Sequence, residues 1–166
     1  MGTKEKAAKI LTKAARVLPG IGSYQDKESL RESDKKLRDH ISSRLAQSVA
    51  TLERSKAELS RTGALSQLKE LDDLSRHMDK LSRTIRYAAR GYAGVFASNQ
   101  VDEKALSDLF EFDLSLKEDI NSLETLVSKI SVNTKTLDSS LLAELRNLLF
   151  GLEKRVGERE NLLSLP

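Results

Sequence analysis

Hydrophobic residues recur along this chain at spacings of three and four positions, which is the period of an α-helix with one buried face. The signal is strongest between residues 71 and 92, where the apolar positions follow a heptad seam. These positions are Leu71, Leu74, Met78, Leu81, Ile85, Ala88 or Ala89, and Tyr92. The pattern predicts a long helix that packs against neighbouring helices and ends within residues 91–96.

Three further segments carry similar stripes and predict long helices over residues 26–61, 102–130 and 137–156. The first stripe contains Leu30, Leu37, Ile41, Leu45, Leu52 and Leu59, with Ser48 and Ser55 in the same row. The second contains Leu106, Leu109, Leu116, Ile120, Leu123, Val127 and Ile130. The third contains Leu137, Leu141, Leu145, Leu148, Leu152 and Val156, and it is widened by Leu142, Leu149 and Phe150. The two serines predict that the first seam is partly polar.

Short breaks separate the predicted helices. Thr62 and Gly63 end the first, residues 97–100 indicate a loop, and Asn133 lies in a break over residues 131–136. Short connections favour antiparallel neighbours, because a short loop cannot return the chain to the far end of a helix. The expected fold class is therefore all-α: an elongated antiparallel bundle of about four long helices, which forms one domain over residues 26–166.

A short basic amphipathic helix is predicted ahead of the bundle, over residues 1–18, and residues 19–25 predict a hinge or linker. The basic residues of this helix are Lys4, Lys6, Lys9, Lys13 and Arg16. Because the net charge of the whole chain is only +3, the positive excess is concentrated here. These residues are candidates for contact with an anionic membrane surface. The alternative is a helix that stays in solvent or docks on the bundle, since alanine fills much of its apolar face.

The composition of the chain argues against catalysis and against export. Cysteine is absent, which excludes disulfides and thiolate zinc sites and fits a reducing compartment. Leu37 and Leu74 stand three residues before the two histidines, His40 and His77, where a di-iron bundle needs glutamate. No nucleotide-binding or hydrolase motif occurs, and no apolar run approaches the ~20 residues that span a bilayer. We therefore expect a non-enzymatic cytoplasmic protein with no metal, cofactor or small-molecule substrate.

A basic stripe runs from Arg76 to Arg90. Its end is a candidate contact for a protein partner or for nucleic-acid phosphates and comprises Arg83, Arg86, Tyr87, Arg90, Tyr92 and Phe96. Residues 75–91 contain five basic residues and one acidic residue, whereas residues 101–125 contain eight acidic and two basic residues. The competing interpretation is that these two segments pair with each other and set the register of their helices.

Three pieces of the chain differ from its leucine-rich and charged surroundings: residues 23–28 (SYQDKE), 87–96 (YAARGYAGVF) and 110–114 (FEFDL). In these pieces the chain resembles uncharacterised small helical proteins of bacteria and archaea. The resemblance implies a cytoplasmic microbial origin, but no activity and no site residues. The function expected from the residues is a helical protein–protein interaction module, which binds a partner or associates with itself. Nucleic-acid binding through the basic stripe and an enzyme of unrecognised class are the alternatives.

Overall fold

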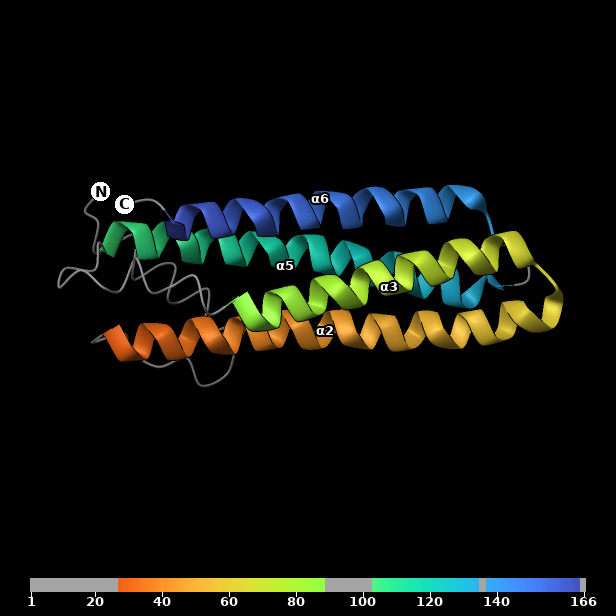
Figure 1. The fold of residues 1–166 in the computed structure, drawn as a ribbon, viewed down its shortest axis with the longest axis horizontal. Helices are drawn as coiled ribbons and strands as arrows, with labels where there is room; N and C mark the ends of the chain where they lie inside the picture. The colour runs from red at the N-terminus through yellow and green to blue at the C-terminus, as the bar shows by residue number, and fades with distance from the viewer. Residues whose placement is uncertain (1–26, 89–102, 135–136, 165–166) are drawn as a thin grey trace.

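Four long helices form the part of the chain that the structure, a computed structural model, describes: residues 27–88, 103–134 and 137–164 (Figure 1). The helices are α2 (Lys27–Thr62), α3 (Leu65–Tyr87), α5 (Glu103–Val132) and α6 (Ser139–Ser164). These ranges contain no strand, and the helices lie side by side in an elongated bundle, which confirms the predicted fold class. The helix predicted over residues 1–18 and the linker over 19–25 lie outside the described residues. The helix predicted to end within residues 91–96 ends earlier, because α3 stops at Tyr87 and Ala88 caps it.

The connection between α2 and α3 is a tight turn that requires glycine. Gly63 has a φ of 75°, in the left-handed region that other residues rarely adopt, and it directly follows the end of α2. The amide of Leu68 already donates to the carbonyl of Ala64, at 3.0 Å, so the next helix begins at once. The stop predicted at Thr62 and Gly63 is confirmed.

The connection between α5 and α6 is closed by polar side chains. The side-chain amide of Asn133 donates to the carbonyl of Lys129 at 2.9 Å, which satisfies a backbone group in the last turn of α5. Asp138 caps α6, because its carboxylate accepts the backbone N–H of Ser140 at 2.9 Å and the Ser140 hydroxyl at 2.7 Å. These two bonds lower the pKa of Asp138. The predicted break at Asn133 is therefore also confirmed.

The bundle consists of two antiparallel hairpins, α2/α3 and α5/α6, which lie side by side with both turns at the same end (Figure 1). Consequently α2 packs on α3 and on α5, whereas α6 packs on α5 and on α3. Helices within a hairpin run antiparallel, but the facing pairs α2/α5 and α3/α6 run parallel. We call the line of contact between α2 and α5 the α2–α5 seam, and that between α3 and α6 the α3–α6 seam.

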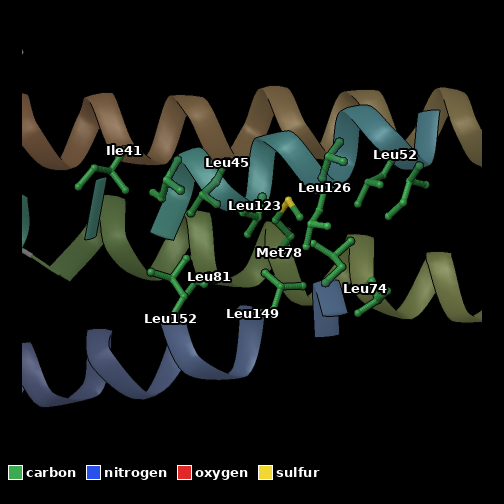
Figure 2. Packing of buried hydrophobic residues seen from close by; sticks show 14 of the residues in the cluster. Ile41, Leu45, Leu52, Leu74, Met78, Leu81, Leu123, Leu126, Leu149 and Leu152 are labelled. Atoms are coloured by element: carbon green, nitrogen blue, oxygen red, sulfur yellow. The ribbon is translucent and has the colours of Figure 1, made fainter. Parts of the chain in front are cut away.

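The core is a continuous row of aliphatic side chains supplied by all four helices (Figure 2). Its described members are Leu37, Ile41, Leu45, Leu52, Leu59, Leu71, Leu74, Met78, Leu81, Ile85, Leu116, Ile120, Leu123, Leu126, Val127, Ile130, Leu142, Leu145, Leu149, Leu152 and Val156. The stripes predicted for α2, α3 and α5 are confirmed at these positions. In α6 the buried face is turned slightly, so Leu142 and Leu149 are fully buried while Leu141 and Leu148 are half-buried. Phe150 does not widen the core as expected, because its side chain is 56% exposed.

Candidate functional site

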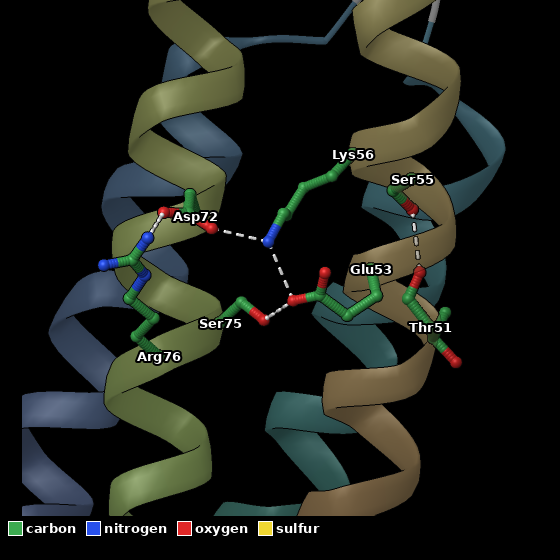
Figure 3. Close-up of polar contacts among 7 residues, drawn as sticks. All are labelled: Thr51, Glu53, Ser55, Lys56, Asp72, Ser75 and Arg76. Carbon is green, nitrogen blue, oxygen red and sulfur yellow. Dashed lines mark hydrogen bonds and ion pairs between the residues drawn. The ribbon is translucent and has the colours of Figure 1, made fainter.

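Ion pairs and hydrogen bonds join α2 to α3 in the half of the hairpin nearer the turn (Figure 3). The ammonium of Lys56 donates to Asp72 at 2.6 Å and to Glu53 at 2.8 Å, and Ser75 donates to Glu53 at 2.5 Å. Hydrogen bonds from Lys56 and Ser75 lower the pKa of Glu53, and the bond from Lys56 lowers that of Asp72. Burial lowers the pKa of Lys56, but its two carboxylate partners raise it above the usual value. All three groups therefore stay charged near neutral pH, as suits a structural clamp rather than proton transfer.

Serine and arginine side chains join α2 to α3 farther from the turn. The Ser82 hydroxyl donates to the carbonyl of Ser42 at 2.9 Å, and Arg86 donates through Nε to the Ser42 hydroxyl at 2.9 Å. Arg38 is buried and donates to the carbonyl of Arg86 at 3.3 Å, in the last turn of α3. A cation at this position complements the partial negative charge at the end of a helix. Arg86, a predicted phosphate contact, is thus partly engaged within the hairpin.

Hydrogen bonds from the guanidinium of Arg44 join the two helices of the α2–α5 seam. Its guanidinium donates to both carboxylate oxygens of Glu124, at 2.8 and 2.5 Å, and to the Asn121 side-chain oxygen at 2.6 Å. The bidentate contact with Glu124 fixes the parallel register of α2 and α5. His40 lies one turn before Arg44 and is half-buried; burial, together with the positive charges of Arg44 and Lys117, lowers its pKa.

The α3–α6 seam is held by two sets of charged groups. His77 lies 2.9 Å from Glu153 through Nε2, and Lys80 lies 3.5 Å from the other oxygen of the same carboxylate. Arg146 donates to Glu70 at 2.5 Å, closer to the turns. Partial burial raises the pKa of Glu153, but the contacts with His77 and Lys80 lower it overall. The contact between His77 and Glu153 could not be predicted from local spacing, because the two residues are 76 positions apart.

Over the described parts of the two segments, the expected pairing of residues 75–91 with residues 101–125 is wrong. Arg76 and Arg83 instead contact Asp72 and Asp79 on their own helix, each at 2.8 Å. Among the acidic residues of α5, Glu124 pairs with Arg44 of α2, and Asp119 pairs with Arg155 of α6. The physical reason is the packing order, because the neighbours of α3 are α2 and α6 while α5 lies diagonally across the bundle.

The predicted contact residues are only partly brought together. Arg83 and Tyr87 lie one turn apart on the exposed side of α3, whereas Arg86 turns toward Ser42 and Ser43 on α2. Three of the predicted partner or phosphate contacts lie outside the described residues: Arg90, Tyr92 and Phe96. So do all the predicted membrane contacts, which are Lys4, Lys6, Lys9, Lys13 and Arg16.

A feature that the sequence interpretation missed is a pair of exposed apolar side chains at the turn end of the bundle, one on each of two helices. Leu65 at the start of α3 is 72% exposed, and Val132 at the end of α5 is 80% exposed. Both residues fall off the heptad stripes of their helices, which is the signal that could have identified them. Lys69 and Lys129 are exposed one turn farther into the same two helices. We call Leu65 and Val132 the apolar tip.

The described residues contain no cluster of histidine and carboxylate groups suited to hold a metal ion. Among the described helices, none is long and apolar enough to cross a membrane. Comparison of the chain with models of known families, with curated proteins and with solved structures gives no match. Any functional interpretation therefore depends on the chain's own residues.

Proposed function

We propose that this chain is a non-enzymatic helical interaction module that binds a protein partner through the apolar tip. The exposure of Leu65 and Val132 carries the proposal, because the free energy falls when large aliphatic side chains are removed from water. They extend from the rigid ends of two packed helices, so little conformational entropy is lost when they are covered.

The charged groups near the tip indicate the chemistry of the partner. Lys69 and Lys129 are exposed, whereas the nearby acidic Glu58 is paired with Arg61 at 2.9 Å. A complementary surface would have an apolar centre and an acidic rim, since unlike charges at the rim of an interface favour association and correct orientation. A second copy of the chain is the self-associating version of the same proposal.

The placement of potentially reactive groups supports the non-enzymatic part. The carboxylates of Asp72, Glu124 and Glu153 each contact a cation on another helix. The Glu53 carboxylate contacts Lys56 on its own helix and accepts a hydrogen bond from Ser75 of α3. General acid–base chemistry requires such groups to converge on a space that a substrate can enter. Here they hold helices together instead.

The test is a pair of matched double variants at exposed positions. Leu65→Glu with Val132→Glu places negative charge on the apolar tip, and we expect partner affinity to fall about tenfold or more. Ala46→Glu with Ala143→Glu adds the same charge at exposed sites elsewhere and should leave the affinity unchanged. Binding is measured by titration with the protein that co-purifies under native conditions. Light scattering at several concentrations tests a second copy in the same variants. Equal binding by the tip variant and the wild type would refute the proposal.

A further inference from the structure

The solvent-facing side of α3 carries three cations in a row that leads to an aromatic ring. The cations are Arg76, Lys80 and Arg83, which we call the cation row, and Tyr87 comes four residues after the last of them. At a rise of about 1.5 Å per residue, the distance from the first cation to the ring is about 16 Å along the helix. The cationic side chains are 78%, 75% and 72% exposed, Tyr87 is 70% exposed, and exposed Asp73 bounds the row at its other end. Cations spaced in this way along a surface suit a ligand with regularly repeated negative charges.

The cation row is paired with carboxylates, but weakly. Its two arginines each contact the aspartate four residues earlier, at 2.8 Å, and Lys80 lies 3.5 Å from Glu153 of α6. Ion pairs with one partner so exposed contribute little to stability, because water screens the charges. Asp72 and Glu153 have second partners, Lys56 and His77, which they keep when another anion binds the row. A phosphate group can therefore replace the carboxylates as the partner of these cations.

A second exposed ring lies beside the cation row, on α6. Phe150 is 56% exposed, and the centroid of its ring lies 5.1 Å from that of His77 on α3. Tyr87 follows His77 by ten residues, so the two exposed rings are separated by about 15 Å along the bundle. Lys80 and Arg83 come between these two levels. Rings and cations therefore alternate along one face of the α3–α6 seam.

We propose that this face binds single-stranded nucleic acid, with phosphates along the cation row and unpaired bases stacked on Phe150 and Tyr87. Surfaces that bind single strands combine these two features, since cations follow the backbone and aromatic rings accept a base of any kind. A duplex would satisfy the cations, but its bases already stack on one another. A chain of carboxylates would satisfy the cations and leave both rings without a flat partner. A single strand satisfies both sets of groups.

The phosphate contacts are tested by the salt dependence of binding. Affinity for a labelled oligothymidylate of about 12 nucleotides is measured by fluorescence anisotropy at several salt concentrations. Lys80→Gln with Arg83→Gln removes two phosphate contacts, so the slope of log affinity against log salt should become shallower by about 1.4. Arg54→Gln with Arg61→Gln removes two exposed cations of α2 and should leave the slope unchanged. Equal slopes for the two double variants would contradict the proposal.

The stacking contacts are tested by removing the rings without removing apolar bulk. Tyr87→Leu with Phe150→Leu should weaken binding of the single strand about tenfold or more and leave the salt slope unchanged, because the cations remain. Binding of a duplex of the same length should not change, since its bases are not free to stack. Circular dichroism checks that the variant is folded. Unchanged affinity for the single strand, or an equal loss for the duplex, would overturn the proposal.

Competition separates nucleic acid from an acidic protein as the ligand of this face. Polyglutamate matched in charge to the oligonucleotide offers anions but no bases, so it should displace the labelled strand far less effectively than unlabelled oligothymidylate does. Displacement by polyglutamate at the same concentration would assign the face to acidic proteins and refute the nucleic-acid proposal.

Discussion

Replacing Leu123 with alanine is expected to lower the free energy of unfolding by about 2–5 kcal/mol, because it removes three buried carbons and leaves a cavity. Leu123 is 0% exposed and lies on α5 in the central layer of the core, in the same region as Met78 (Figure 2). Its neighbours belong to packed helices that cannot collapse freely into the space.

The control for this experiment is Leu65→Ala, which removes the same atoms from an exposed leucine. We expect that variant to stay within about 0.5 kcal/mol of the wild type. Denaturation in urea, followed by circular dichroism, measures both variants. Similar effects of the two substitutions would mean that Leu123 does not lie in the core.

Replacing Ser82 with leucine is expected to cost about 1–3 kcal/mol, although it adds apolar surface to a buried position. The Ser82 hydroxyl lies 3.5 Å from that of Ser42 across the interface between α2 and α3, and both serines are buried. The larger side chain would push the two helices apart, since packed interiors leave little empty space.

Ser82→Ala separates the effect of the lost hydrogen bond from the effect of the added side-chain volume. It removes the hydrogen bond to the Ser42 carbonyl without adding volume, and about 1 kcal/mol is expected. Thermal unfolding ranks the leucine variant, the alanine variant and the wild type. A leucine variant as stable as the wild type would show that α2 and α3 pack loosely at this point.

The hydrophobic pattern was sufficient to predict the helices and most of the buried positions, as Leu71, Leu74 and Met78 illustrate. A heptad stripe specifies which face of a helix is buried, because side chains at that spacing share one side. It does not specify the neighbour. Leucine stripes bury similar area whether α3 lies beside α5 or beside α6, so the packing order could not be predicted from them.

The charged contacts could be predicted only where both partners lie on one helix. Asp72 with Arg76 and Asp79 with Arg83 are four residues apart, the spacing at which opposite charges meet. Both pairs were available in the sequence and argued against a free basic stripe. The contact of His77 with Glu153 depends on the packing of two hairpins, and no local spacing indicates it.

The same distinction applies to the candidate site. Tyr87 was predicted as a contact residue and is exposed, but Leu65 and Val132 were overlooked because they belong to no stripe. An apolar residue that lies off the hydrophobic stripe of a regular helix either is exposed without a functional role or belongs to a contact surface. Two such residues at one end of a bundle favour the second interpretation.

The side-by-side packing of the two hairpins produces the α2–α5 and α3–α6 seams, and chemical crosslinking tests it directly. Cysteines replacing Glu70 and Arg146, on α3 and α6, should be joined in high yield by a short thiol-specific crosslinker, because the native side chains lie 2.5 Å apart. Cysteines replacing Glu70 and Lys129, on α3 and α5, should not be joined, because these helices are diagonal. A crosslink in the second pair and none in the first would contradict the two-hairpin arrangement.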